Sequence, residues 1–323
     1  MGRLQVPILP KPSNPFRAGP LLTPASASVF RRTGVLLFAI ATMAGAAVMF
    51  ITCRTKTSPD VTIWAWERNE DLTFTDSRVK VAYFAGTIYL RDSRVSFRPR
   101  RQQLKLRAGA STMPVFRIVS IRDSSDPPPL SSVDVVVNHI VTQLKTVGGA
   151  TKVQIDFDAR QDERQFYRCL LEKLRRASPA GTRISITALA SWLLDDRWLT
   201  ARVADEVVAM LFSMGPGRRE VLSLLKRKPL DAGVNVDIAV GISANERDTN
   251  ERICQSGVLE RAKSVYIFNS HPWTESRFKR IENEVIEKWS TIGGAIAPKM
   301  ASRRGTTPDP RLFLHQAAQD VAF

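Results

Sequence analysis

The sequence predicts an α/β fold, a (β/α)8 barrel of the TIM type, that follows an N-terminal transmembrane helix. Eight short apolar runs recur along the chain after residue 57, and helical patterns separate several of them. Strands that alternate with helices favour a parallel sheet with helices outside it. This region holds roughly 235 residues, which suits eight units because such barrels usually have about 250 residues. A doubly wound open sheet is the alternative.

Each predicted strand is a short run of apolar and β-branched residues. In chain order the strands are Val61–Trp66, Val81–Gly86, Val115–Val119, Val153–Asp158, Arg183–Leu189, Glu206–Phe212, Asp237–Ser243 and Ser264–Asn269.

Helical patterns place apolar residues on one face of a helix. They cover Val133–Thr146, Arg164–Ala177, Arg218–Lys228 and Arg277–Trp289. Gly148, Pro179 and Pro229 follow the first three patterns, and such residues commonly end a helix. Residues 87–113 look extended instead. We therefore expect an irregular unit between the second and third strands.

An apolar segment near the N-terminus predicts a membrane anchor. Residues 34–53 are twenty residues without a charge, which is the length needed to span the hydrocarbon of a bilayer. Arg31 and Arg32 precede the segment, so the positive-inside rule places the N-terminus in the cytoplasm and the bulk of the chain outside. A cleaved signal peptide, a lipoprotein signal ending at Cys53 and twin-arginine export are the alternatives.

Three other ranges complete the predicted organisation. Residues 1–33 are basic and contain several prolines, which indicates a disordered leader. Residues 58–290 form the barrel domain. Residues 291–323 have little apolar periodicity and are predicted to be a flexible tail.

The composition is strongly basic, with a formal net charge of +16. A basic surface favours anionic partners such as phospholipid or an acidic polysaccharide. Nucleic acid is not expected as a partner, because the chain has no nucleic-acid-binding motif. Three cysteines do not make a disulfide framework. The sequence also has no cysteine or histidine spacing typical of a metal site, so no metal or cofactor is predicted.

Two aspartates at the end of the fourth predicted strand mark the candidate site. In Val153–Asp158, Asp156 and Asp158 alternate with apolar residues, so both carboxylates lie on one face of the strand. Buried carboxylates without partners are costly, and active sites of such barrels lie at the carboxyl ends of the strands. The alternative for Asp156 is a structural carboxylate paired with Arg117 or Arg160.

Two segments of the chain resemble a bacterial family called domain of unknown function 3142. They are QIDFDARQDERQFYRCLLEKLRR and RISITALASWLL, in which the matching residues are Tyr167, Ser185, Thr187, Ala188, Leu189 and Trp192. Near the start, Thr62–Arg68 is similar to the Trp-rich first strand of that family, although Ala65 and Glu67 differ from it. The resemblance covers residues 58–275. It implies a glycoside-hydrolase-like barrel exported across the bacterial inner membrane into the periplasm, and it implies no established activity.

A second resemblance is to chitinase-type glycosidases, which carry Asp-x-x-Asp-x-Asp-x-Glu on the fourth barrel strand. Asp156 and Asp158 match the last two aspartates of that motif. Val153 stands at its first aspartate, and Arg160 stands at its catalytic glutamate. The general acid of that mechanism is therefore missing from its usual place.

Glycoside hydrolysis requires two carboxyl groups, one protonated and one ionised. Many barrel glycosidases that resemble this layout use acids after strands four and seven. By that analogy, Asp158 is the acid and Glu246 is the nucleophile or base. Glu67, after the first strand, is a further candidate. The alternative for Glu246 is a solvated loop residue.

Other side chains near the strand ends are predicted to bind a sugar, because tryptophan faces stack on sugar rings and binding sites are commonly lined by aromatics. They are Trp66, Arg160, Trp192 and Trp273. Core packing is the alternative for the tryptophans. The predicted function is hydrolysis of an envelope or secreted polysaccharide by a membrane-anchored barrel. A non-catalytic glycan-binding protein and a structural envelope protein are the alternatives.

Overall fold

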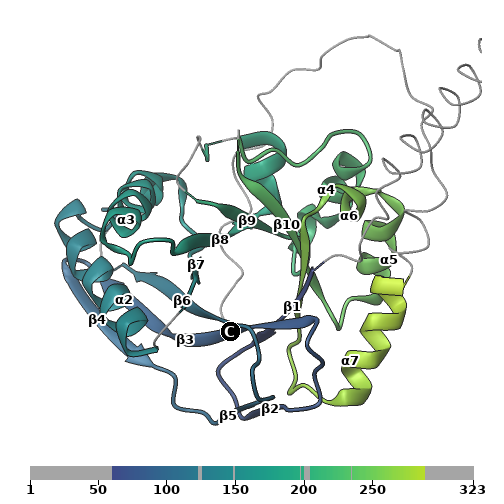
Figure 1. Ribbon diagram of the computed structural model, residues 1–323. Coiled ribbons are helices and arrows are strands. Elements are labelled where there is room, and N and C mark those ends of the chain that lie inside the picture. The colour runs from purple at the N-terminus through teal and green to yellow at the C-terminus, as the bar shows by residue number, and fades with distance from the viewer. Residues whose placement is uncertain are drawn as a thin grey trace, which may run out of the picture. The chain divides into compact units, whose positions relative to one another are not determined.

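The protein forms a closed barrel of eight parallel strands (Figure 1). The computed structural model describes residues 60–122, 126–147, 150–196, 198–199, 204–233 and 235–287. The barrel strands are β1 (Asp60–Ala65), β3 (Val79–Arg91), β6 (Thr112–Ile121), β7 (Lys152–Asp156), β8 (Arg183–Leu189), β9 (Glu206–Met210), β10 (Asp237–Ser243) and β11 (Ser264–Phe268). Neighbours in this order are hydrogen-bonded, and β1 pairs with both β3 and β11, which closes the ring.

All eight predicted strands are present, and the predicted TIM-like barrel is confirmed. The predicted and observed bounds agree most closely at β8 and β10, where both ends coincide. They differ most at β3 and β6, which are longer than predicted because they pair with each other from Val81 to Arg91. Ring closure excludes the open sheet.

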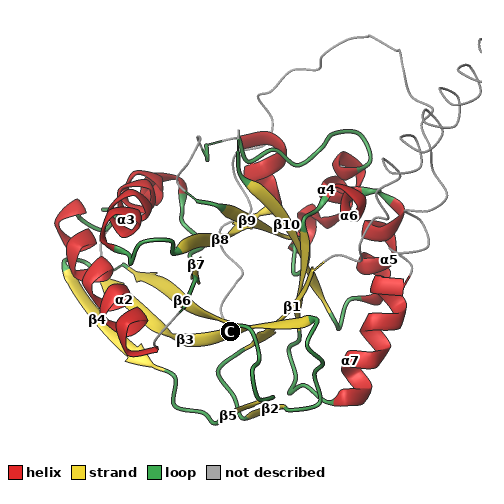
Figure 2. Cartoon of the chain, viewed as in Figure 1, coloured by secondary structure: helices red, strands yellow, loops and turns green. Residues whose placement is uncertain are grey.

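Helices lie outside the ring of strands (Figure 2). They are α2 (Val133–Val147), α3 (Arg164–Ala177), α4 (Arg218–Leu225), α5 (Arg247–Gln255), α6 (Val258–Arg261) and α7 (Glu275–Ile281). The predictions of α2 and α3 are confirmed almost to the residue. Helix α7 begins earlier than predicted, because the Thr274 side chain accepts a hydrogen bond from the Arg277 amide and caps the helix. Helices α5 and α6 were missed by the sequence patterns.

The first two crossovers of the barrel contain no helix within the described residues. Strand β2 (Glu70–Leu72) pairs with β5 (Leu104–Leu106), and β4 (Arg94–Pro99) runs antiparallel to β3. The extended character predicted for residues 87–113 is confirmed. Gly86 allows β4 to pack closely, since a Cβ atom there would lie 2.5 Å from the Phe97 ring and 2.6 Å from the Arg98 carbonyl oxygen.

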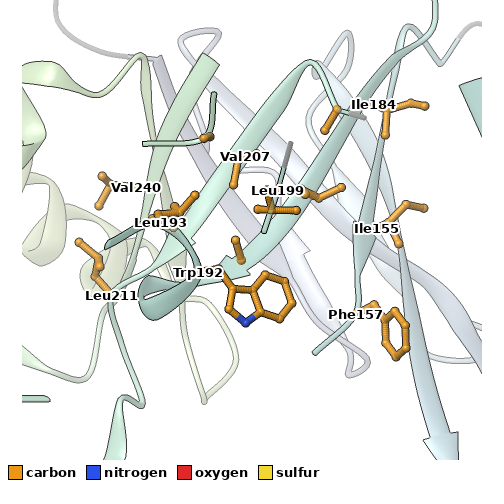
Figure 3. Close-up of a cluster of buried hydrophobic side chains, with 14 of the residues drawn as sticks. Ile155, Phe157, Ile184, Trp192, Leu193, Leu199, Val207, Leu211 and Val240 are labelled. Atoms are coloured by element: carbon orange, nitrogen blue, oxygen red, sulfur yellow. The ribbon is translucent and has the colours of Figure 1, made fainter. Parts of the chain in front are cut away.

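Two apolar layers fill the protein. The larger layer lies between the strands and the helices, and Figure 3 shows part of it around Ile155, Trp192 and Val207. The smaller layer fills the inside of the barrel around Trp64, Val115, Val208 and Tyr266. Gly241 makes room for this layer, because a Cβ atom there would lie 3.1 Å from the Trp64 ring. The barrel interior is therefore a packed core, as is usual for this fold.

The predicted segments at both ends of the chain lie outside the described residues. They are the leader 1–33, the apolar segment 34–53 with Cys53, and the tail 291–323. In the part of the chain that the structure describes, none of the helices is long and apolar enough to cross a membrane.

Candidate active site

Four aromatic side chains gather at the carboxyl end of the barrel, and we call them the aromatic mouth: Trp66, Phe84, Phe212 and Phe268. The Trp66 ring lies 5.3 Å from the Phe84 ring and 6.3 Å from the Phe268 ring, measured between centroids. Phe268 stacks on Phe212 at 5.2 Å. Trp66, Phe212 and Phe268 are only half-buried. The mouth therefore presents aromatic surface above the packed interior.

Asp156 lies at the end of β7, beside this mouth. Its neighbour across the β6–β7 pair is Arg117. The Thr187 hydroxyl on β8 donates a 2.7 Å hydrogen bond to one Asp156 carboxylate oxygen. Burial raises the pKa of Asp156, while the charge of Arg117 and the bond from Thr187 oppose that rise. Asp156 is thus held in a fixed position by the next strand.

Asp158 is the free carboxylate of the pair. Its side chain makes no hydrogen bond or ion pair with any residue that the structure describes. Burial by the strand ends and repulsion from Asp156 raise its pKa to about 6, against the pull of Arg117. Asp158 is exposed to solvent, so burial contributes less to the rise of its pKa than the repulsion from Asp156 does. Burial and the nearby charge of Asp156 thus both favour the protonated form of Asp158.

Arg117 connects the carboxylates to the aromatic mouth. Its guanidinium lies 5.7 Å from the centre of the Trp66 ring, a cation–π geometry. Within the described ranges it makes no ion pair within 4.0 Å with either aspartate. The sequence-based alternative of a tight Asp156–Arg117 pair is thus replaced by a longer-range attraction.

Glu67 and Glu246 are each held by other partners. The Glu67 carboxylate forms a 2.7 Å ion pair with Arg98 on β4. The Glu246 carboxylate accepts a 2.8 Å hydrogen bond from the Ser213 amide and lines a separate surface cavity next to Arg218. Neither one is brought into contact with Asp156 or Asp158.

Arg160 is exposed and begins the turn that leads into α3. Its backbone amide donates a 2.7 Å hydrogen bond to the Glu163 carboxylate. Its position two residues beyond Asp158 keeps it near the carboxyl end of β7.

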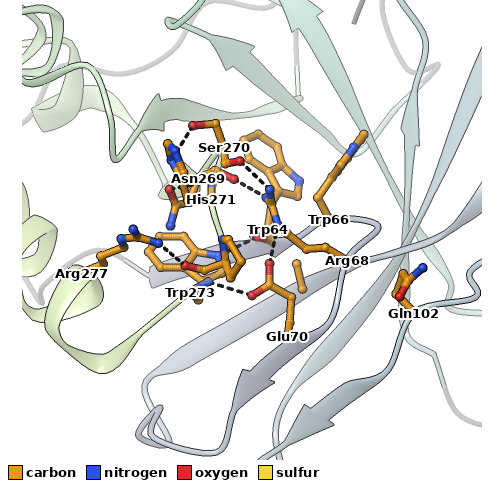
Figure 4. Close-up of polar contacts among 12 residues, drawn as sticks. Trp64, Trp66, Arg68, Glu70, Gln102, Asn269, Ser270, His271, Trp273 and Arg277 are labelled. Carbon is orange, nitrogen blue, oxygen red and sulfur yellow. Dashed lines mark hydrogen bonds and ion pairs between the residues drawn. The ribbon is translucent and has the colours of Figure 1, made fainter.

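Trp192 and Trp273 are buried, with at most 4% of either residue exposed. Trp192 packs edge-to-face against Trp198, with ring centroids 5.0 Å apart. Trp273 donates from its ring nitrogen to the Trp64 carbonyl and from its amide to the Glu70 carboxylate, each at 2.8 Å (Figure 4). We leave both tryptophans out of the proposed site because a sugar cannot reach them.

No protein-family model matches the chain, and no curated protein is similar to it in sequence. The resemblances to domain of unknown function 3142 and to chitinase-type barrels therefore stay predictions. Among the described residues, no three His, Cys, Asp or Glu side chains are grouped closely enough to hold a metal ion.

Several site residues were missed by the sequence patterns. Phe84, Phe212 and Phe268 were treated as parts of strands, although alternation from buried interior positions such as Val208 and Tyr266 leads directly to the last two. Thr187 was noted only as a match to a family motif. Its role at Asp156 follows from the β7–β8 register, which a single sequence does not reveal.

Proposed function

We propose that the carboxyl end of the barrel binds a glycan and that Asp158 acts as the general acid in hydrolysis of a glycosidic bond. The observation that carries this proposal is the free carboxylate of Asp158, next to the fixed Asp156 and the aromatic mouth. A carboxyl group with a pKa of about 6 is protonated often enough near neutral pH to donate a proton.

The aromatic mouth supplies the surface for binding. Aromatic faces pack against the apolar faces of sugar rings, and the surrounding polar groups orient the hydroxyls. Trp66 is the central ring, because it contacts two other aromatics and Arg117. Arg117, whose guanidinium lies over the Trp66 ring, can donate hydrogen bonds to a bound sugar.

In the proposed reaction, the Asp158 carboxyl donates its proton to the glycosidic oxygen as the bond from that oxygen to the anomeric carbon breaks. Water then adds to the anomeric carbon, and the proton that it loses returns to Asp158. Ionised Asp156, held by Thr187, favours the protonated form of Asp158 and stabilises the positive charge that develops on the sugar.

The position of the two carboxylates favours a particular class of substrate. Asp156 ends β7 and Asp158 follows it by two residues, so both carboxylates come from one strand end, whereas the usual mechanism needs carboxylates on either side of the scissile bond. Substrate-assisted hydrolysis avoids this need, because the carbonyl oxygen of a 2-acetamido group bonds to the anomeric carbon as the leaving oxygen departs, and the water of the second step breaks that bond. Polysaccharides with 2-acetamido sugars are therefore the first substrates to test. If residues 34–53 anchor the chain, the substrate is an envelope or secreted polysaccharide.

A second candidate function is glycan binding without hydrolysis. The engagement of Glu67 by Arg98 and of Glu246 by Ser213 favours it, because neither glutamate is free to serve as a second catalytic carboxylate. The aromatic mouth serves this function equally well.

The two functions are separated by assaying the full chain in neutral detergent for binding and for release of reducing ends from acetamido-sugar oligosaccharides. Hydrolysis by the wild type that falls by at least about 100-fold in Asp158→Asn supports the enzyme. Binding that needs Trp66 without any release of sugar supports the binding protein. Asp162→Asn is the matched control, since Asp162 is also near the end of β7 but is paired with Arg122. If the chain neither binds nor cleaves any of the acetamido-sugar oligosaccharides, both proposed functions are contradicted.

A further inference from the structure

The opposite end of the barrel contains a cavity of about 410 Å³, which is large enough for a small ligand. Its lining residues lie within the first three residues of the barrel strands or just before them. The cavity is therefore at the end of the barrel opposite to Asp158. Its four basic residues are Lys80, Lys152, Arg183 and Lys263, and its three acidic residues are Asp60, Glu206 and Asp237. The cavity thus has one positive charge in excess.

Lys263 carries this excess charge. The other three cations pair with the three acids, at 2.5 Å for Lys80–Asp60 and at 2.7 Å for the other two pairs. The Lys263 ammonium has no partner among the residues that the structure describes, and the residue is exposed. Its backbone amide donates to the Ile238 carbonyl at 2.9 Å, which fixes the residue where β11 begins.

Two of the ion pairs leave their cations available to an incoming ligand. Lys80 with Asp60 and Arg183 with Asp237 are exposed at both partners, with 38% or more of each side chain accessible. Such pairs contribute little stability, so their cations can turn toward a stronger acceptor. Lys152 is different, because Glu206 is buried and also accepts a 2.6 Å hydrogen bond from the Tyr266 hydroxyl.

Hydroxyl-bearing residues also line the cavity. They include Ser111, Thr112 and Thr151. A phosphate group has several strong acceptor oxygens and binds well where ammonium, guanidinium and hydroxyl groups converge. We propose that this cavity is a phosphate-binding site in which Lys263 is the principal contact.

The phosphate can come from two sources. Asp60 lines the cavity, and only residues 54–59 separate it from the apolar segment 34–53 that the sequence predicts to span a membrane. If that segment is anchored in a membrane, a lipid headgroup is one source. A free phosphorylated small molecule is the other.

Thermal unfolding of the full chain in neutral detergent tests the site. Inorganic phosphate is compared with acetate at equal ionic strength, and dihexanoyl phosphatidylglycerol is compared with dihexanoyl phosphatidylcholine. We expect the midpoint to rise with phosphate or with phosphatidylglycerol. A response to phosphate identifies a site for free phosphate, and a response to phosphatidylglycerol alone identifies a headgroup site.

Lys263→Gln should lower, by about tenfold, the affinity for the ligand that raises the unfolding midpoint, as expected for the loss of one charge-assisted hydrogen bond. Lys145→Gln is the control, because Lys145 is an exposed lysine of α2 outside the cavity. Equal shifts with acetate, equal responses of the two variants, or no response to either phosphate source would overturn the proposal.

Discussion

Asp158 differs from the other acidic side chains near the strand ends because its carboxylate makes no hydrogen bond or ion pair with a described residue, and only the longer-range charge of Arg117 attracts it. Glu67 forms an ion pair with Arg98, and Asp162 forms one with Arg122. Asp156 accepts a hydrogen bond from the Thr187 hydroxyl. A protein keeps an uncompensated carboxylate next to another one at some cost in stability, and such groups are concentrated at functional sites. This cost gives the first test.

The stability of the protein should depend on the ionisation of Asp158. Its pKa in the folded protein is about 6, above the ordinary value of 3.8, so its favourable contribution is present below about pH 4 and is lost as the pH rises through about 6. Asp158→Asn removes the ionisable carboxyl, so the variant does not lose this stability as the pH rises. We expect the variant to be more stable than the wild type at pH 7.5, with a smaller difference at pH 4, in urea unfolding followed by circular dichroism.

The matched variant Asp162→Asn should have the opposite effect. Its hydrogen bonds and ion pair with Arg122 lower the pKa of Asp162, so ionisation of this residue stabilises the folded state. The variant should be less stable than the wild type at pH 7.5. If Asp158→Asn also lowers stability at that pH, its carboxylate is engaged by a partner.

Trp66 should determine glycan affinity. Replacement by alanine removes the ring that joins Phe84, Phe268 and Arg117. We expect affinity for an oligosaccharide that binds the wild type to fall at least about tenfold, the loss of more than 1 kcal/mol typical of an aromatic anchor. Trp192→Phe is the control for a buried tryptophan. Isothermal titration calorimetry measures both, and equal affinity of Trp66→Ala and wild type would place binding elsewhere.

At the scale of elements, strand β3 shows what a local sequence pattern can and cannot predict. The run of apolar residues from Val81 to Gly86 was sufficient to identify the strand, and the extended character of residues 87–113 was sufficient to predict an irregular crossover. The extension to Arg91 and the antiparallel partner β4 were not predicted, because they depend on the pairing of β3 with two other strands. Pairing is a long-range property that a single strand does not encode.

Gly86 should be essential to the contact between β3 and β4. Gly86→Ala places a Cβ atom 2.5 Å from the Phe97 ring and 2.6 Å from a backbone oxygen, and the backbone cannot yield easily. We expect a loss of about 2 kcal/mol of unfolding free energy, as is typical of overpacking. Gly217→Ala is the control, since a Cβ atom there meets no atom within 4 Å. Equal stabilities of the two variants in urea would contradict the close contact.

In the candidate site too, a local sequence pattern predicts residues of one strand but not those that the barrel brings together from several strands. Alternation along Val153–Asp158 was enough to select Asp156 and Asp158, because both fall on one predicted strand, although β7 itself ends at Asp156. The aromatic mouth draws its members from four different strands or the residues that follow them, and the barrel brings them together only after it closes. Glu246 was selected by its place after the seventh predicted strand, but the Ser213 amide engages its carboxylate.

At the scale of the whole molecule, a buried ion pair helps to close the barrel. The Arg68 guanidinium lies 2.7 Å from the Glu70 carboxylate and also donates to the carbonyls of Asn269 and Ser270, which follow β11 (Figure 4). Glu70 in turn accepts a hydrogen bond from the Trp273 amide. The first and last barrel strands are thus joined at their carboxyl ends.

Removing Arg68 should therefore be costly. Arg68→Met removes the ion-pair partner of the Glu70 carboxylate, whose side chain is fully buried, and leaves only the longer-range charge of Arg100, so we expect a loss of about 3 kcal/mol in unfolding free energy. Arg78→Met is the control. Its ion pair with Asp76 is exposed, so its loss should cost less than about 1 kcal/mol. Chemical denaturation at neutral pH compares them, and a similar small loss in both would show that the pair does not hold the ends together.

At the carboxyl end of the barrel, burial and the neighbouring charge of Asp156 hold the pKa of the free Asp158 carboxyl above its ordinary value. Carbon-13 NMR of labelled aspartate carboxyl groups during a pH titration tests this directly. We predict that Asp158 titrates near pH 6 and that its pKa falls in Asp156→Asn, because the repelling charge is gone. An Asp158 carboxyl that titrates near its ordinary value of 3.8, unchanged by Asp156→Asn, would contradict the account.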